Sequence, residues 1–328
     1  MTTIAIGAEL EAALASTDPG TSRWRVEYAK SADGASQSFP LIRIAGANLG
    51  PTGVFVAGVH GDEYEGPGAL WDLAEKLDPT LLSGQVLIVP IANVQAFAAG
   101  TRTSPIDNEN LARIFPGNST GTLSHRLAAA LMEGVVSRAD FLVDSHSGGV
   151  RLAFAPVAGF YDDPSIDPKV AEQSIALAKS MGIAYLWQLP PVTGVLSYEA
   201  ARRGIPVCGA EIGGRGNCLD ADRADYLAAY LSVLAHHGMI APEHKRLLTT
   251  ICFEGDWARS AASGYLQTTV TIGDKVNAQA IVGRLLDPLG FIVEELRASH
   301  AGTVLGVRHL NTVQPGDLTI CIARETLR

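Results

Sequence analysis

The chain has 328 residues, of which 47% are hydrophobic and 18% are charged, so it is long and apolar enough to bury a large core. Its net charge of −9 and the absence of any basic run exclude the clustered positive surface that nucleic-acid binding needs. No stretch approaches the ~18 uninterrupted apolar residues of a membrane span, and the first residues do not resemble a signal peptide. The four cysteines form no CxxC pair. Together these observations predict a cytoplasmic protein with reduced thiols.

Strand-like and helix-like runs alternate along most of the chain. Residues 23–29 and 38–47 are predicted to form an opening antiparallel pair of strands. The alternation that follows is typical of a mixed, mostly parallel sheet with helices on both faces, so the predicted fold class is α/β. Buried strands are expected at 52–61, 84–93, 139–149 and 204–214, and helices at 66–77, 123–137, 170–182 and 224–238.

The pattern changes near residue 250, where the chain becomes rich in strands and turns. Residues 263–285 and 301–323 form a weak repeat, in which a small residue and glycine precede a β-rich run, Gly-Asp and a second β-rich run. A repeated half of this size predicts a small all-β, barrel-like domain. We therefore expect a large α/β domain over residues 1–250 and a small C-terminal domain over residues 251–328.

Three apolar runs end in polar residues, in the stretches VHGDE, VDSHSGG and GAEIGG. Open α/β sheets place their sites at the carboxyl ends of strands, so the three clusters are expected to converge. His60 and Glu63 form an H-x-x-E pair on a turn that enters a helix, and zinc accepts such nitrogen and oxygen ligands. His146 is the natural third ligand, and Asp144 is a candidate partner for the second ring nitrogen of His146 or of His60.

Each of these signals has a plainer alternative when it is taken alone. An isolated H-x-x-E is most often a solvated surface pair, and DSHS is also a capping turn. Glu211, in GAEIGG, is either a general base that activates water or a strand-end carboxylate paired with Arg202 or Arg203. Arg102 and Arg113, in a loop rich in Pro, Asn and Asp, either bind a carboxylate or an oxyanion or are solvated surface groups.

Taken together, these segments resemble the succinylglutamate desuccinylase/aspartoacylase family of the zinc carboxypeptidase-like superfamily. The matching stretches are GVHGDEYEGPGAL, NVQAFAAGTRTSPIDNENLARIFPG, DSHSGG and GAEIGGRG, which follow the family's order over residues of about 54–216. The C-terminal β region also fits this family. The sequences HGDEYEGP, GTRTSPID and HSGG are most similar to those of the subgroup that includes the N-acetyl-diaminobutyrate deacetylases.

The resemblance implies a role for each candidate residue. His60, Glu63 and His146 would hold one zinc ion per chain. Glu211 would be the general base and later the proton donor, and Arg102 would polarise the acyl carbonyl and stabilise the oxyanion. The fold implied is that of the zinc carboxypeptidases, with the C-terminal region beside the mouth of the site.

Arg113 would bind a substrate carboxylate, but the loop that carries it departs from the family pattern. In the family this loop usually has the sequence NLNR or DLNR. This chain has NLAR, with Ala112 in place of the asparagine that assists the arginine. Either Asn108 or Asn110 replaces that asparagine, or the substrate lacks the carboxylate. We include Asn110 with Arg113 among the expected substrate-binding residues.

The predicted function is that of a zinc-dependent hydrolase, a deacylase, which cleaves the amide bond of a small N-acylated amino acid or a related metabolite. The alternatives are a metallocarboxypeptidase that acts on peptides and a catalytically silent homologue that binds a metabolite. The intact set of His, Glu, His and Glu argues against the silent homologue. The sequence leaves open the acyl group, the amine, the divalent ion and whether the chain forms a homo-oligomer.

The C-terminal repeat resembles the β-barrel hybrid of biotinyl and lipoyl carriers, but its turn ELRASHAG has no lysine, which disfavours a carrier role. We expect the region to cap the mouth of the site, with Tyr265 or His300 as candidates for the pocket wall. In the stretch VFVAGVHGDEYEG, Gly61 is expected to turn the backbone between strand and helix, and Asp62 and Glu65 are expected to be supporting charges.

Overall fold

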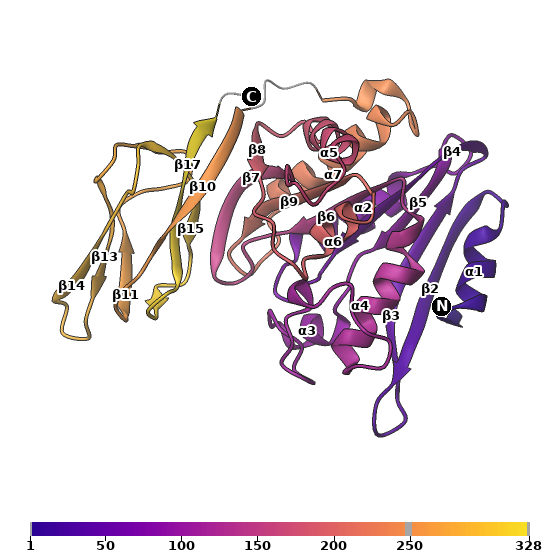
Figure 1. Ribbon diagram of the computed structural model, residues 1–328, viewed down its shortest axis with the longest axis horizontal. Coiled ribbons are helices and arrows are strands. Elements are labelled where there is room, and N and C mark those ends of the chain that lie inside the picture. The colour runs from indigo at the N-terminus through magenta and orange to yellow at the C-terminus, as the bar shows by residue number, and fades with distance from the viewer. Residues whose placement is uncertain (1, 247–250, 327–328) are drawn as a thin grey trace.

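Figure 1 shows the computed structural model, in which residues 2–246 and 251–326 are described. Their strands form two sheets. Within the described residues the large, mixed sheet has 13 strands in the order β1-β2-β3-β5-β4-β6-β9-β7-β8-β10-β17-β15-β12, and the small sheet has the antiparallel order β14-β13-β11-β16. No helix among the described residues is both long and apolar enough to cross a membrane.

The first part of the chain alternates strands with helices, as the sequence predicts. Its strands are β1 (Thr2–Ala5), β2 (Gly20–Lys30), β3 (Ser36–Ala45), β4 (Asn48–Ala57), β5 (Ser83–Val89), β6 (Phe141–His146), β7 (Leu152–Phe160), β8 (Tyr185–Gln188) and β9 (Val207–Gly214). Its helices are α1 (Ala8–Ala15), α2 (Glu65–Lys76), α3 (Val94–Ala99), α4 (Leu123–Gly134), α5 (Pro168–Ser180), α6 (Leu196–Ala201) and α7 (Asp220–His236), and its short 3₁₀ helices are η1 (Leu111–Arg113), η2 (Val136–Arg138) and η3 (Pro242–His244).

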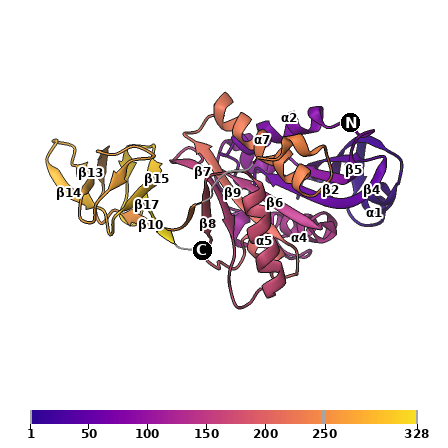
Figure 2. The same cartoon turned by 90° about the horizontal axis from the view of Figure 1, so that it is seen from above.

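The centre of the large sheet consists of the parallel strands β5, β4, β6 and β9. Side chains of β4 alternate between the two faces: Val54 and Val56 belong to one buried core, and Phe55 and Ala57 belong to the other. Helices α2 and α7 pack against the second face, and α4 covers the first, so these helices lie on opposite sides of the sheet (Figure 2). The predicted α/β class, with a mixed sheet and helices on both faces, is confirmed.

The C-terminal part of the chain contains only strands and turns among its described residues. Its strands are β10 (Ile251–Arg259), β11 (Gly264–Thr268), β12 (Lys275–Val276), β13 (Ile281–Leu286), β14 (Ile292–Arg297), β15 (Gly302–Arg308), β16 (Thr312–Val313) and β17 (Leu318–Thr326). The two sequence repeats each supply a strand, a two-residue strand and a further strand. The predicted all-β character is therefore confirmed, while the predicted domain boundary at residue 250 lies outside the described residues.

Two strands of the first part pair with the C-terminal strands. β8 runs parallel to β10, and β7 runs antiparallel to β15, with Phe154 opposite Gly306. Because β7 also pairs with β8, and β10 and β15 both pair with β17, the five strands β7, β8, β10, β17 and β15 close into a ring of hydrogen-bonded neighbours. Figure 1 shows these strands side by side between the helical part and the small sheet. This ring was not predicted, and it joins the two parts by backbone pairing.

Candidate active site

The three polar strand ends predicted to converge belong to neighbouring parallel strands. β4 pairs with β6, and β6 pairs with β9, in a register that places His146 directly opposite Glu211. The stretch VHGDE follows β4 on the other side of β6. The carboxyl ends of the three strands therefore meet at one edge of the sheet, where an open α/β sheet places its site.

The turn after β4 depends on two glycines for different reasons. Gly58 has a φ of +62°, in the left-handed region that favours glycine, so this residue turns the chain out of the strand. Gly61, which was expected to make that turn, is not in the left-handed region. A Cβ atom on Gly61 would lie only 2.0 Å from the backbone carbon of Ala96 in α3, so the lack of a side chain allows close packing instead. Gly61 lies in the turn between β4 and α2, as expected, and its contribution is this close approach to α3.

Asp62 and Glu65 connect the three loops that carry the site. The carboxylate of Asp62 accepts a hydrogen bond of 3.2 Å from the backbone N–H of Val150, in the loop after β6. Glu65, the first residue of α2, accepts a bond of 2.5 Å from the N–H of Gly214 at the end of β9. Both side chains are buried, with exposed fractions of 4% and 1%. These carboxylates fix the positions of the loops, which agrees with their predicted supporting role.

Glu63 lies between the two histidines. Its Oε1 atom is 2.7 Å from Nδ1 of His60, and its Oε2 atom is 2.9 Å from Nδ1 of His146. On the far side of the His146 ring, Nε2 lies 3.3 Å from Oδ1 of Asp144, which is fully buried. Asp144 thus faces His146 rather than His60, and this contact leaves Nδ1 of His146 as the nitrogen that points to Glu63.

The donor set fits a divalent metal ion. His60, Glu63 and His146 each offer one ligand atom, and these atoms lie within 4.8 Å of one another. Two imidazole nitrogens and a carboxylate oxygen are ligands that zinc and other divalent ions accept, and a carboxylate behind a ligating imidazole is the usual supporting partner. The structure therefore brings together all four residues that the sequence predicted for the metal and its support.

The charges of the buried cluster depend on one another. Burial alone would lower the pKa of His146, but Asp144 and Glu63 outweigh it and hold that pKa well above the usual range. Burial would raise the pKa of Glu63, but His60 and His146 outweigh it and hold the pKa well below its usual range. A metal ion bound between these side chains would displace a proton from them, because imidazole ligates in its neutral form.

Glu211 is not paired with either arginine that the alternative interpretation offered. Arg202 bonds to Glu199, and Arg203 bonds to Glu133. Burial, followed by the charge of Glu63, raises the pKa of Glu211 to about 8. Its Oε2 atom is enclosed and has no hydrogen-bond partner among the described residues. A carboxylate with a pKa near neutrality can accept a proton and return it within one reaction.

The two predicted arginines reach the same cavity from the loop between α3 and α4. The Nη1 atom of Arg102 donates a bond of 3.1 Å to Oε1 of Glu63, and 43% of the Arg102 side chain is exposed. Arg113 donates to the backbone oxygen of Ala112, and burial, followed by the charge of Arg102, lowers the Arg113 pKa. Two guanidinium groups on one cavity form a site for an anionic group of a ligand.

Asn110 has a local structural contact. Its side-chain oxygen accepts a bond of 3.0 Å from the N–H of Ala112, which caps the short helix η1. Ala112 itself lines the cavity, whereas Asn110 does not appear in the described lining. The predicted contact between Asn110 and substrate therefore stays a prediction.

The cavity at this edge of the sheet has a volume of about 590 Å³. Its lining includes His60, Arg102, Arg113, His146 and Glu211. Another part of the lining, which was not predicted, is apolar. It includes Phe154 of β7, Trp187 of β8, and Gly255, Trp257 and Leu318 from the C-terminal strands. The C-terminal region does contribute to the cavity wall, as expected, but Tyr265 and His300 do not line it.

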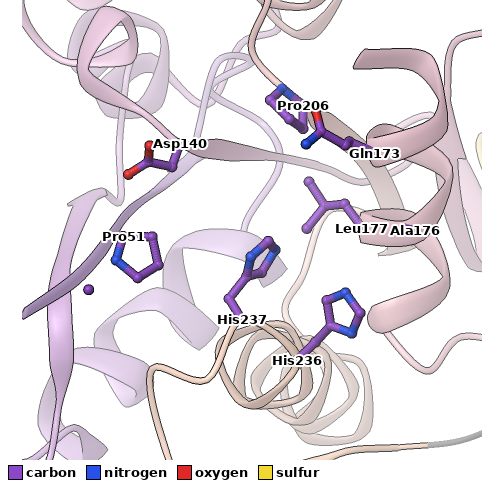
Figure 3. A pocket seen from close by; sticks show the side chains of 9 residues that line it. Pro51, Asp140, Gln173, Ala176, Leu177, Pro206, His236 and His237 are labelled. Carbon is purple, nitrogen blue, oxygen red and sulfur yellow. The ribbon is translucent and has the colours of Figure 1, made fainter. Parts of the chain in front are cut away.

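A second cavity, of about 620 Å³, lies at the other end of the same strands (Figure 3). His236 and His237, at the end of α7, line it together with Asp140, which precedes β6. Asp140 accepts a bond of 2.7 Å from the N–H of Thr52, and the ring of His237 stacks on Phe141 at 4.0 Å between ring centroids. No group of three metal-ligating residues occurs here among the described residues.

Comparison with known proteins gives one family. The model of the succinylglutamate desuccinylase/aspartoacylase catalytic domain matches residues 49–237. The chain is 30% identical over 289 residues to an N-alpha-acetyl-L-2,4-diaminobutyric acid deacetylase of Halomonas elongata, a match that covers 85% of this chain and 83% of that protein.

Solved structures show the same fold. The product-bound ectoine utilization protein EutE (DoeB) of Ruegeria pomeroyi superposes with a TM-score of 0.86 at 29% identity, covering 94% of this chain and 97% of that one. A succinylglutamate desuccinylase of Silicibacter sp. TM1040 also gives a TM-score of 0.86, at 26% identity, covering 94% and 96%. The similarity extends through the C-terminal strands, beyond the region that the family model matches.

Proposed function

This chain belongs to the succinylglutamate desuccinylase/aspartoacylase family of amidohydrolases, and from that premise we propose that it is a zinc-dependent deacylase of a small N-acylated amino acid. The observation that carries the proposal is the position of Glu63 between the imidazole nitrogens of His60 and His146, two residues that line a cavity together with Glu211 and two arginines. The Halomonas elongata relative is a deacetylase by name, which makes acetyl the first acyl group to test.

His60, Glu63 and His146 would hold the zinc ion, with Asp144 fixing the ring of His146. When bound, such an ion lowers the pKa of a coordinated water and polarises a carbonyl group. Glu211 would accept the proton of the attacking water, because its enclosed Oε2 atom has no hydrogen-bond partner among the described residues and burial makes the ionised carboxylate a stronger base. The same carboxyl group returns the proton to the amine as the amide bond breaks.

The arginines supply positive charge on the side of the substrate. Arg102 lies beside Glu63 and is exposed enough to reach a ligand, so it stabilises the negative charge that develops on the acyl oxygen. Arg113 is held at Ala112 and binds the carboxylate of the amino acid. Both roles are proposed from the position of the guanidinium groups on the cavity wall.

The proposal is tested by metal analysis and turnover on one preparation. The purified chain should contain about one zinc ion per chain and should hydrolyse members of a panel of acetyl-, succinyl- and formyl-amino acids. Chelation should remove both the zinc and the activity, and added zinc should restore both. An active metal-free sample would show that the mechanism is wrong.

The panel should also contain short peptides with free carboxyl ends. Release of C-terminal residues faster than deacylation would favour a carboxypeptidase instead. A zinc-free chain that binds the acylated compounds without turnover would favour a metabolite-binding homologue. Each of the three functions thus has its own pattern of metal content, deacylation and peptide cleavage.

A further inference from the structure

The apolar wall of the active-site cavity indicates what kind of substrate it selects. Resting on the proposed deacylase function, we propose that this wall binds an aromatic or large unbranched apolar group next to the scissile amide bond. The wall is defined here as Phe154, Trp187 and Trp257, which come from β7, β8 and β10 of the closed ring of strands. The substrate would then be an N-acyl amino acid with such a group on its acyl or its amine side.

The three aromatic side chains of the wall form one cluster. The ring of Phe154 lies 5.5 Å from that of Trp257, centroid to centroid, in an edge-on arrangement at 80°. The same Phe154 ring lies 6.3 Å from that of Trp187. Phe154 is 7% exposed, whereas both tryptophans are partly exposed. A partly exposed aromatic surface inside a cavity gains free energy when an apolar group covers it.

Two glycines, on strands β10 and β15, leave space for the aromatic side chains of this cluster. A Cβ atom on Gly306 would lie 3.0 Å from the Trp257 ring and 3.2 Å from the Phe154 ring. A Cβ atom on Gly255 would lie 3.2 Å from the Trp187 ring. The positions of the aromatic rings are therefore set by backbone pairing and by missing side chains on β10 and β15. The apolar wall is a preformed surface of the fold.

The charges of the cavity argue against a cationic group at the wall. Among the described residues that line the cavity, Glu211 is the one carboxylate, and it is assigned to proton transfer. Arg102 and Arg113 contribute positive charge to the same space. Aromatic faces do attract cations, but an ammonium group that leaves water is stabilised best by a carboxylate partner, and no other described residue of the cavity lining supplies one. An uncharged apolar group meets no such cost.

A pair of substrates of equal length separates the two possibilities. N-acetyl-L-norvaline and N-alpha-acetyl-L-2,4-diaminobutyrate differ by a methyl group in place of an ammonium group. We expect kcat/KM to be about tenfold or more higher for the norvaline compound, because an ammonium group finds no free carboxylate among the described residues that line the cavity. A faster reaction with the diaminobutyrate compound would overturn the inference.

Two further substrates identify the side of the amide bond that meets the wall. N-acetyl-L-phenylalanine carries its ring on the amine side, and N-benzoyl-L-alanine carries its ring on the acyl side. At least one of them should exceed N-acetyl-L-alanine by about tenfold in kcat/KM. If N-acetyl-L-alanine is faster than both, the wall does not select apolar groups and the inference is wrong.

Variants connect this preference to the wall. Trp257→Ala should lower the ratio of kcat/KM for the preferred aromatic substrate over N-acetyl-L-alanine by about tenfold, and Trp257→Phe should restore most of it. Trp71→Ala is the matched control, because Trp71 lies on α2, is 46% exposed and does not line the cavity. An unchanged ratio in folded Trp257→Ala would contradict the inference.

Failure of the proposed function can be recognised separately. If no acyl-amino acid is hydrolysed, calorimetry can still measure binding of L-phenylalanine and L-2,4-diaminobutyrate to the zinc-loaded protein. Tighter binding of L-phenylalanine would support the wall as an apolar site without any turnover. Tighter binding of L-2,4-diaminobutyrate would reject it.

Discussion

Strand β6 connects two cavities of similar volume, about 590 Å³ at its carboxyl end and about 620 Å³ at its amino end, and two histidines line each of them. At the carboxyl end Glu63 lies between His60 and His146. At the amino end His236 and His237 belong to no group of three metal-ligating side chains among the residues that the structure describes. Neither the size of a cavity nor a pair of histidines distinguishes the two ends.

The difference lies in the carboxylates and in their effect on the imidazoles. Asp144 and Glu63 hold the pKa of His146 well above the usual range. Burial, assisted by the charge of His236, lowers the pKa of His237 to about 4 despite the opposing charge of Asp140. Carboxylates therefore support a protonated imidazole at His146, whereas burial dominates at His237, and the group of metal-ligating side chains among the described residues lies at the carboxyl end.

Replacing one histidine at each end tests this comparison with the largest expected effect. His60→Ala removes a ligand, so zinc should be lost and kcat/KM should fall on the order of 10³-fold or more. His237→Ala, the matched variant at the amino end, should keep the zinc content and the turnover. Elemental analysis and the acyl-amino acid assay measure both. Zinc retained by folded His60→Ala, or lost from His237→Ala, would contradict the assignment of the two ends.

Glu211→Gln separates catalysis from metal binding at the carboxyl end. The amide cannot accept the proton of water, so kcat should fall by about 10² to 10⁴-fold while zinc content stays unchanged. Glu133→Gln is the control, since Glu133 is an exposed residue that pairs with Arg203 far from the proposed proton transfer. A kcat within about twofold of the unmodified chain would remove Glu211 from the mechanism.

The sequence predicted the metal end of β6 because the information there is local. His60 and Glu63 are three residues apart, and the polar stretches VDSHSGG and GAEIGG each end an apolar run, so strand topology alone brings them together. Asp144 could be predicted as a partner but not assigned to His146 over His60 until the ring orientation was known. Periodicity and strand ends thus determined the first set of contacts.

The apolar wall could not be predicted because its contacts are distant in the sequence. Phe154 and Trp257 are about a hundred residues apart and meet only because β7 pairs with β15. The strand Tyr185–Gln188 has four residues, too few for a periodic signal, and it joins the C-terminal strands by parallel pairing with β10. Pairing between short strands depends on backbone hydrogen bonds that leave little trace in composition.

Asp144 and Asp140, near the two ends of β6, allow a test with an effect of intermediate size. Asp144→Asn keeps the shape of a fully buried side chain but removes the charge that faces Nε2 of His146. The zinc dissociation constant should rise by about 10 to 100-fold, with turnover largely recovered at saturating zinc. Asp140→Asn should leave zinc affinity unchanged, because Asp140 bonds to Thr52 at the other end. Competition with a zinc indicator measures both, and equal affinities for the two variants would argue against a supporting role for Asp144.

The amino end of β6 is tested by the pH dependence of the protein's stability. Of the effects predicted here, this one is expected to be the smallest. The folded protein holds the pKa of His237 at about 4, whereas the unfolded chain has the ordinary value of 6.5. Protons therefore bind the unfolded chain more readily between these values. The contribution of His237 to stability is fully present above pH 6.5 and is lost as the pH falls from 6.5 toward 4. Because the ring is partly exposed, the loss should amount to about 1 kcal/mol or less.

Melting temperatures of the full chain and of His237→Gln, measured from pH 7.5 to pH 5, isolate this contribution. The unmodified chain should lose more stability across that range, by on the order of 1–2 °C, because glutamine does not titrate. His300→Gln is the control, since this variant removes a histidine from the surface of the C-terminal part and should follow the unmodified chain. The ring of His237 stacks on Phe141, the first residue of β6, so a protonated imidazole there would place a charge against the start of the strand whose other end holds His146. If His237→Gln loses as much stability as the unmodified chain, the amino end tolerates a positive charge, and the contrast between the two ends would rest on Glu63 and Asp144 alone.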